Sequence, residues 1–161
     1  HVDMLNVLIT VVSYLAGKPV FIGNDGWLRD AAEIHAGTIA PHLLEKGVDL
    51  MLDFTLAKTE VESIWYIDRK AEAGKETLQL LENKNKGHIQ VYATESADHP
   101  LKKVQQGALA TSDTLLLTKT RCPVIDLPRE LPTKTPARPE RTGAARRLYT
   151  PRSGIYQLAP A

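Results

Sequence analysis

Residues 2–8, VDMLNVL, place one carboxylate, that of Asp3, between a short apolar start and an apolar segment with helical spacing. Residues 108–116, ALATSDTLL, repeat this arrangement around Asp113 late in the chain. Each stretch predicts a strand that ends at an acid and passes directly into a helix. If both strands belong to one parallel sheet, both acids lie at its C-terminal edge, where open α/β sheets place their binding sites.

The rest of the chain alternates between strand-like and helix-like patterns. Strands are expected at 19–22, 61–67, 89–93, 108–112 and 123–125. Helices are expected at 4–16, 27–36, 41–58, 71–86 and 97–106, with a short helix before the last strand. This alternation predicts an α/β fold, with a doubly wound and mostly parallel central sheet that carries helices on both faces.

Charge and composition divide the chain into a body and a tail. The 161 residues, 43% hydrophobic and 24% charged, suit one globular domain. Residues 134–161 carry six Lys/Arg and one Glu, a net charge of +5, whereas the 133 preceding residues carry 14 Lys/Arg and 18 Asp/Glu, a net charge of −4. We expect a domain over 1–131 and a basic, proline-rich tail over 132–161. The tail either attracts a polyanion or is a solvated, disordered segment.

The cellular setting is inferred from three features. Cys122 is the only cysteine, so no internal disulfide can form and a reducing compartment, the cytoplasm, is expected. The longest apolar stretch, 4–16, is shorter than the roughly 20 residues of a membrane span, so no membrane association is expected. Only two residues precede Asp3, too few for an ordinary strand, so further sequence is expected upstream. A homodimer is compatible with the sequence.

Five aspartates share one expected location. Four of them end predicted strands and one begins the helix after a strand: Asp3, Asp68, Asp113 and Asp126, and Asp98. Right-handed crossovers place all five at the same edge of the sheet. Clustered carboxylates repel one another unless a cation neutralises them, and Mg²⁺ and Mn²⁺ prefer such oxygen ligands. One interpretation is therefore a divalent metal site, and the other is that each acid caps a helix or forms a turn.

Several neighbouring side chains could support these acids. Asn6 follows Asp3 by one helical turn, so it could orient the carboxylate or reach the same ligand. Asp30 and Glu33 lie three residues apart on the predicted helix 27–36, where they either complete the metal shell or face solvent. Ser112 could share with Asp113 the task of capping a helix.

Basic residues stand beside two of the acids, and other chemistries lack a signal. Arg69, Lys102 and Lys103 could contact phosphates near Asp68 and Asp98, or could be ordinary solvated cations. No glycine-rich phosphate loop follows the first strand, and the histidines show no zinc-like pairing. The serine before Asp113 has no Gly-x-Ser-x-Gly context either.

The spacing Asp3-x-x-Asn6, together with ATSD at 110–113, resembles the PIN-like nuclease superfamily. Within it, residues 17–20 (GKPV) and 25–30 (DGWLRD) are similar to an uncharacterised prokaryotic PIN-like family. Its members usually carry a further N-terminal domain, so this chain would be the C-terminal domain. The resemblance covers roughly residues 2–127.

The resemblance implies a three-layer α/β/α PIN-like fold around a mostly parallel sheet. It also implies a Mg²⁺- or Mn²⁺-dependent phosphodiesterase that acts on RNA more than on DNA. By position, the catalytic metal ligands would be Asp3, Asp98 and Asp113, and Asp30, with Glu33 as its rival, would be a further ligand. A non-catalytic PIN-like module that binds nucleic acid or a protein remains the alternative. A small-molecule phosphohydrolase is disfavoured because Asp3 has no second Asp two residues later.

Overall fold

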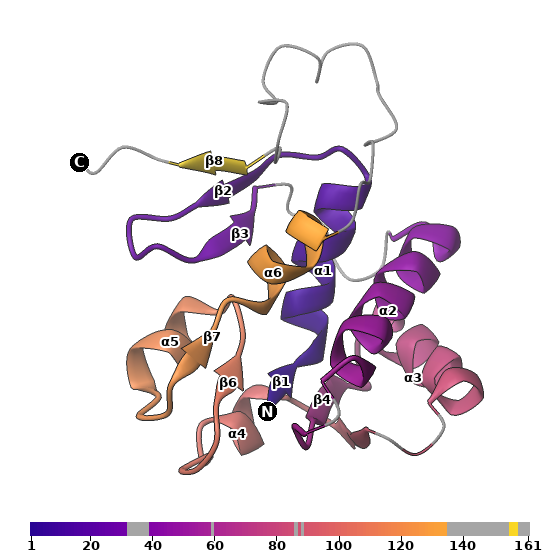
Figure 1. Ribbon diagram of the computed structural model, residues 1–161. Coiled ribbons are helices and arrows are strands. Elements are labelled where there is room, and N and C mark those ends of the chain that lie inside the picture. The colour runs from indigo at the N-terminus through magenta and orange to yellow at the C-terminus, as the bar shows by residue number, and fades with distance from the viewer. Residues whose placement is uncertain (32–38, 59, 86, 88, 135–154, 158–161) are drawn as a thin grey trace.

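The computed structural model describes residues 1–31, 39–58, 60–85, 87, 89–134 and 155–157. Its centre is a parallel sheet of five strands in the order β5-β4-β1-β6-β7. Figure 1 shows β7, β6, β1 and β4 following one another across the molecule. The strands are β1 (Val2–Asp3), β4 (Ile64–Asp68), β5 (Gln90–Thr94), β6 (Leu109–Ala110) and β7 (Val124–Ile125). The order reverses between β1 and β6, which lie side by side although they are far apart in sequence.

One face of the sheet is covered by four helices. They are α1 (Met4–Leu15), α2 (Pro41–Leu56), α3 (Glu72–Lys84) and α6 (Leu127–Lys134). Trp65 and Ile67 alternate along β4 and are fully buried against these helices, as a period of two requires. Gly47 allows the helices α1 and α2 to approach closely. A Cβ at this position would lie only 2.7 Å from Cδ1 of Leu8.

The other face carries two shorter helices, α4 (Asp98–Leu101) and α5 (Thr114–Lys119). They bury Leu101, Leu109 and Leu116 in a separate cluster, against which Tyr66 packs. Cys122 lies buried nearby as a free thiol, as expected. The expected α/β fold with three α/β/α layers and a mostly parallel sheet is therefore confirmed. Of the helices in the described part of the chain, none has the length and hydrophobicity that crossing a membrane requires.

A second, smaller sheet has the strand order β3-β2-β8. It consists of β2 (Val20–Ile22), β3 (Leu28–Asp30) and β8 (Ile155–Gln157), and β8 runs parallel to β2. The expected helix over 27–36 is wrong at its start, because Leu28–Asp30 pairs antiparallel with β2. The turn that joins them includes Gly26 at φ +85°, a conformation that suits glycine. Residues 32–38 lie outside the described part of the chain.

The helix α6 crosses the expected boundary between body and tail. It runs from Leu127 to Lys134, beyond residue 131, and Leu127 and Leu131 are buried in the main core. Asp126 begins this helix, since its Oδ1 accepts a hydrogen bond from the backbone N–H of Arg129 at 3.3 Å. The expected helix 97–106 is shorter than predicted and ends at Leu101.

Candidate functional site

The carboxylate of Asp3 lies at the end of β1 and is almost completely buried, with 1% of the residue exposed. Its Oδ2 accepts two hydrogen bonds, from the Thr111 hydroxyl at 2.8 Å and from the Asn6 amide at 2.6 Å. Asp3 occupies the N-cap position of α1, yet its side chain makes no capping hydrogen bond. Asn6 therefore orients this carboxylate, as its spacing predicted, and helix capping does not explain Asp3.

The electrostatic setting of Asp3 is unfavourable for a lone anion. Burial raises the pKa of Asp3 from an ordinary value of 3.8 to about 6, and the hydrogen bonds from Thr111 and Asn6 only partly oppose this rise. The negative charges of Asp98 and Asp113 raise the pKa further. Both acids thus lie within electrostatic reach of Asp3, and a bound cation would relieve the cost of burying its charge.

Asp113 follows β6 and begins α5. Its Oδ1 accepts a hydrogen bond from the backbone N–H of Leu115 at 2.8 Å, so the expected capping role is confirmed. The Asp113 backbone N–H donates to the hydroxyl of Thr111 at 3.1 Å, and this hydroxyl in turn donates to Asp3. Ser112 does not cap α5, because its hydroxyl donates instead to the Asn6 carbonyl at 3.4 Å. Thr111 and Ser112 thus attach the start of α5 to β1 and α1.

Asp98 is the first residue of α4, as predicted, but the N-cap position belongs to Ala97. Its Oδ2 lies 2.9 Å from the ammonium of Lys102, one helical turn later. The charge of Asp98 therefore acts on Asp3, and Lys102 partly neutralises the charge of Asp98.

Asp68 and Asp126 have clear structural roles. Asp68 ends β4 as expected, and its Oδ1 accepts from the Lys70 backbone N–H at 2.8 Å in the turn that follows. Asp126 follows β7, and its Oδ2 accepts from the Leu28 backbone N–H at 3.0 Å. Burial raises the pKa of Asp126. These two acids fit the alternative of turn and cap residues, and Asp126 also attaches β3 to the main sheet.

Asp30 is placed differently from the prediction. It lies on β3 opposite Val20 of β2, so it shares no helix face with another acid. The expectation that Asp30 and Glu33 lie together on one helix is wrong for Asp30, because the pairing of β3 with β2 replaces the start of that helix. Glu33 lies outside the described residues.

Arg29 is a site residue that the sequence did not indicate. Its Nε donates to the Ser112 carbonyl at 3.2 Å, beside Asp113. Its terminal nitrogens bind both carboxylate oxygens of Asp25 at 2.6 and 2.5 Å, and only 18% of its side chain is exposed. The spacing of four residues between Asp25 and Arg29 could have suggested their pairing, but no local pattern shows the contact with Ser112.

The expected phosphate-binding cations lie around the same edge of the sheet. Arg69 and Lys70 both bind the exposed carboxylate of Glu95, at 3.2 and 3.1 Å. Within the described ranges Lys103 has no ion pair, whereas its neighbour Lys102 is paired with Asp98. These contacts are exposed, so a polyanion could replace them at small cost.

The donor chemistry of the Asp3 site fits Mg²⁺ or Mn²⁺, since its groups are carboxylate, amide and hydroxyl oxygens. Both hydrogen bonds to Asp3 go to Oδ2, so Oδ1 keeps its lone pairs. No three His, Cys, Asp or Glu side chains of the described segments form a ready metal-binding group. An ion at Asp3 would therefore complete its shell with water or with Asp98 and Asp113 after their side chains rotate.

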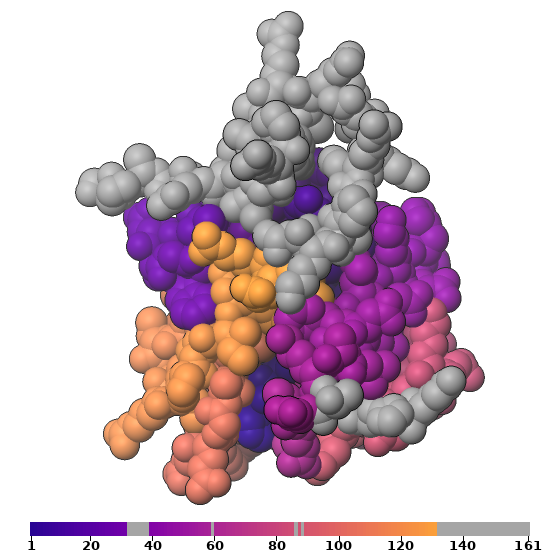
Figure 2. All heavy atoms as spheres, in the orientation of Figure 1, coloured from indigo at the N-terminus to yellow at the C-terminus, as the bar shows by residue number. Residues whose placement is uncertain are grey.

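A groove of about 670 Å³ lies on the opposite face of the sheet. Val2, Ala110 and Ile125 are in register and line it, whereas the side chain of Asp3, the next residue, points to the other face. Figure 2 shows the hollow between the magenta α2 and the orange α6 segments, with indigo N-terminal atoms at its floor. The groove is thus separate from the Asp3 carboxylate.

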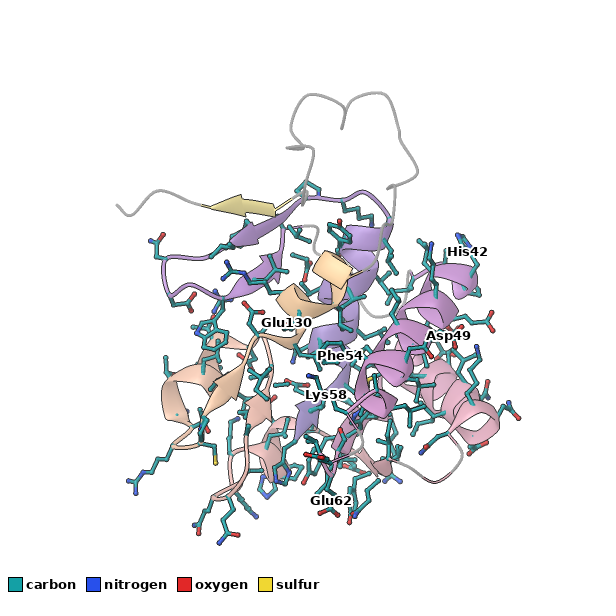
Figure 3. All side chains as sticks on the ribbon, in the orientation of Figure 1. His42, Asp49, Phe54, Lys58, Glu62 and Glu130 are labelled. Atoms are coloured by element: carbon teal, nitrogen blue, oxygen red, sulfur yellow. The ribbon has the colours of Figure 1, made fainter. Side chains whose placement is uncertain are left out.

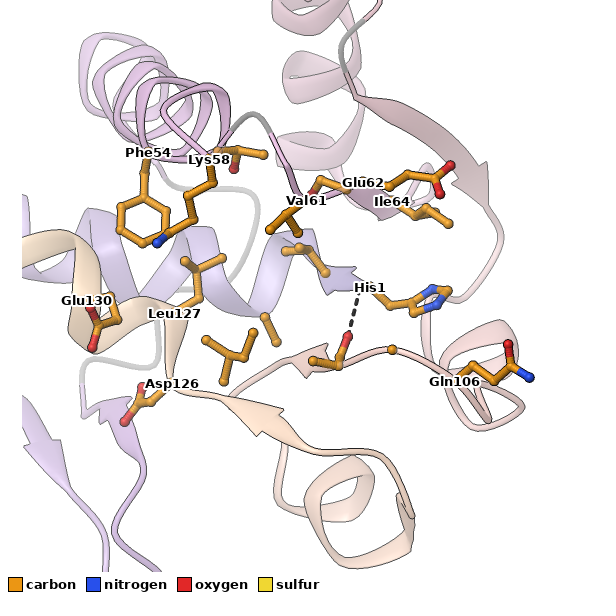
Figure 4. Close-up of a pocket in the computed structure, with 17 residues that line it drawn as sticks. His1, Phe54, Lys58, Val61, Glu62, Ile64, Gln106, Asp126, Leu127 and Glu130 are labelled. Atoms are coloured by element: carbon orange, nitrogen blue, oxygen red, sulfur yellow. Dashed lines mark hydrogen bonds between the residues drawn. The ribbon is translucent and has the colours of Figure 1, made fainter.

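Apolar side chains dominate this groove (Figure 4). The Lys58 ammonium lies 4.9 Å from the ring centroid of Phe54, and Glu130 of α6 stands across the groove from them (Figures 3 and 4). At its far end the backbone nitrogen of His1 donates to the Ala108 carbonyl at 2.8 Å, shown dashed in Figure 4. Among the lining residues only Asp126 is one of the acids expected at the strand ends.

The strand order, which reverses between β1 and β6, places a buried acid at the switch point of an open α/β sheet. This arrangement defines a three-layer α/β/α protein with an acidic C-terminal sheet edge. The family model described as "Domain of unknown function (DUF5616)" matches residues 1–130, and the chain belongs to this family. No curated protein and no solved structure matches the chain.

Proposed function

We propose that this protein is a Mg²⁺- or Mn²⁺-dependent phosphodiesterase that hydrolyses RNA. The observation that carries the proposal is the carboxylate of Asp3, which is buried and has a pKa raised to about 6. It lies at the switch point of the sheet, where ligands of open α/β folds bind. The charges of Asp98 and Asp113 act on it from two other segments of the chain.

In this proposal Asp3, Asp98 and Asp113 hold one or two ions. Asn6 and Thr111 fix the rotation of the Asp3 carboxylate through Oδ2, so its other oxygen is presented in one orientation. The chemistry that a bound Mg²⁺ or Mn²⁺ supplies in such sites is activation of water and stabilisation of negative charge on phosphate oxygens.

The substrate is proposed from charge. Arg69, Lys102 and Lys103 would contact phosphates without reading base sequence. The basic segment 134–161 would add an attraction to polyanions that weakens with salt. Two further parts of the proposal come from the sequence. The preference for RNA over DNA follows from the resemblance to PIN-like nucleases, and the site of action in the cytoplasm follows from the single cysteine.

The test is cleavage of a 5′-labelled single-stranded RNA in Mn²⁺, Mg²⁺, Ca²⁺ or EDTA. We expect cleavage in Mn²⁺ or Mg²⁺ and none in EDTA, with loss of cleavage in Asp3→Asn and Asp113→Asn. The control variant Asp53→Asn changes an exposed acid on α2 and should keep the wild-type rate. Equal cleavage by wild type and Asp3→Asn, in preparations shown to be free of contaminating nuclease, would contradict the proposal.

Specific contacts favour one alternative, a non-catalytic module that binds nucleic acid or a protein. Asp113 caps α5, Asp98 is paired with Lys102, and the described acids form no group of three. Binding of RNA in EDTA, with no turnover in any of the metals, would support the module over the enzyme.

A further inference from the structure

Asp3 has two aromatic neighbours in the sheet. Its register partner on β4 is Tyr66, and the partner of Tyr66 on β5 is Tyr92. Because side chains that are in register across parallel strands share a face, Asp3, Tyr66 and Tyr92 form a row on one face of the sheet. Strands lie about 4.8 Å apart, so the row from Asp3 to Tyr92 spans roughly 10 Å.

The rings of this row are stacked on one another. The centroids of Tyr66 and Tyr92 lie 5.7 Å apart with an interplanar angle of 19°. The ring of His1 lies 5.9 Å from that of Tyr66, at 24°, and its Nδ1 is 3.2 Å from the Tyr66 hydroxyl. The tyrosines are thus held in place by neighbouring rings.

The outer end of the row is open. In the described segments, α4 and α5 pack over Leu109 and against one side of Tyr66, while α1, α2 and α3 cover the opposite face. Tyr92 is 50% exposed, and among the described residues its hydroxyl has only a long hydrogen bond, 3.4 Å, to Gln90. Tyr92 thus presents a half-exposed ring that is stacked on Tyr66.

The surroundings of the row suit a polyanion. The residues that follow β4 and β5, 68–70 and 95–103, carry four cations, Arg69, Lys70, Lys102 and Lys103, against three acids, Asp68, Glu95 and Asp98, while Asp3 and Asp113 add negative charge at the inner end of the row. Aromatic rings on a sheet surface beside basic side chains stack unpaired nucleobases, whose π faces are free in single strands and occupied in duplexes.

We infer that Tyr92, backed by the stacked ring of Tyr66, forms a stacking surface for an unpaired base of single-stranded RNA, next to the Asp3 site. This inference deepens the proposed function and rests on it for the nature of the ligand. A base held on Tyr92 would direct the strand along the row toward Asp3, so unpaired RNA is the substrate class.

The test measures binding without cleavage. Fluorescence anisotropy with a fluorescein-labelled ten-nucleotide oligouridylate in EDTA gives the Kd of each variant. Tyr92→Ala and Tyr92→Leu should each raise Kd about 5- to 100-fold, because alanine substitution of a stacking ring has effects of this size. Tyr92→Phe should stay within about twofold of wild type, since it keeps the ring. Tyr92→Leu keeps apolar bulk, so it separates stacking from packing.

The control is Leu56→Ala, which removes an exposed apolar side chain from α2 on the other side of the sheet and should leave Kd unchanged. An RNA duplex of the same length should bind more weakly than the single strand.

Equal Kd values for wild type, Tyr92→Ala and Tyr92→Leu, or no binding of the oligonucleotide by wild type, would overturn the inference. Cleavage assays decide the proposed function separately. If the Tyr92 variants lose binding while wild type cleaves RNA in no metal, the stacking surface stands and the nuclease proposal fails.

Discussion

The hydroxyl of Thr111 donates a hydrogen bond of 2.8 Å to Oδ2 of Asp3, joining two residues that are 108 positions apart. The same hydroxyl accepts the backbone N–H of Asp113 at 3.1 Å. One side chain therefore connects the acid that ends β1 with the acid that begins α5, across the point where the strand order reverses.

Thr111→Val removes this donor while keeping the shape of the side chain. Because the hydrogen bond lowers the pKa of Asp3, we expect that pKa to rise above about 6. The buried groups left without a partner should lower the free energy of unfolding by about 1–3 kcal/mol. Urea denaturation and NMR titration of the Asp3 carboxyl measure both effects. Thr111→Ser keeps the hydroxyl and should retain the wild-type pKa, and equal shifts in both variants would contradict this role.

Asp3 should make the metal-free protein less stable as the pH rises. Its pKa is higher in the folded state, about 6, than its ordinary value of 3.8, so the folded protein binds more protons between these values. Its contribution is fully present below pH 4 and is lost as the pH passes 6, a change of about 3 kcal/mol. Asp126, whose pKa burial also raises, acts in the same sense, whereas Asp25, whose pKa is lowered by Arg29, acts in the opposite sense.

The variant Asp3→Asn isolates this contribution. The difference in unfolding free energy between Asp3→Asn and wild type, measured from pH 4 to 8, should grow in favour of the variant and level off above pH 6. Mn²⁺ should raise the Tm of wild type above pH 6, and this rise should be absent in the variant. A difference that does not change with pH would contradict the raised pKa.

Substitution of Asp113 can separate its charge from its capping role. Asn is as good an N-cap as Asp, so Asp113→Asn should keep the stability of wild type, whereas Asp113→Ala should lose about 1 kcal/mol. Both variants should lose Mn²⁺-dependent cleavage. Thermal denaturation beside the RNA assay checks the pair, and cleavage by Asp113→Asn at the wild-type rate would limit Asp113 to a structural role.

Arg29 should hold the hairpin of β2 and β3 against the sheet edge. The planar guanidinium of Arg29 binds both oxygens of Asp25 and also reaches the Ser112 carbonyl, which a lysine ammonium cannot do. Arg29→Lys should therefore lose the hydrogen bond to Ser112 although it keeps the positive charge. Hydrogen exchange should become faster at Leu28, whose backbone N–H donates to Asp126. Exchange at Trp65, in the centre of the sheet, should stay unchanged, and equal exchange at Leu28 in both proteins would exclude this anchoring role.

Gly74 should be intolerant of a side chain. A Cβ at this position would lie 1.9 Å from the carbonyl oxygen of Asp68, so either α3 or the end of β4 must move. Gly74→Ala should therefore lower the free energy of unfolding by about 2 kcal/mol or more. Gly87→Ala, which meets nothing within 4 Å but has φ of +84°, should cost about 1 kcal/mol. Chemical denaturation of both variants gives this comparison.

The main sheet could be predicted because its signals are local. Each of Asp3, Asp68 and Asp98 stands where an apolar or β-rich run ends or a helix begins, and the structure places them so. The position of Asn6 one turn after Asp3 suggested two roles, and the hydrogen bond between them agrees with one of these, orientation of the carboxylate. The alternation of strand and helix then fixed the layers, since parallel strands require crossovers.

The remaining parts depend on contacts between distant segments. β3 is a strand because β2 supplies its hydrogen bonds and because Ser112 and Asp126 hold it in place, and none of these partners is visible in residues 27–36. The end of α6 lies in the segment expected to be a proline-rich tail, yet the burial of Leu127 and Leu131 makes α6 a core helix. The row of Asp3, Tyr66 and Tyr92 could not be predicted either, because it depends on how β1, β4 and β5 align with one another.

The pairing of β8 with β2 has a consequence for shorter forms of the protein. A chain that stops after Leu131 loses β8, and the backbone N–H and C=O groups along one side of Val20–Ile22 then lack their partners. Such an open strand is a template for a second molecule, so the shortened protein should aggregate at concentrations where the 161-residue chain stays dispersed.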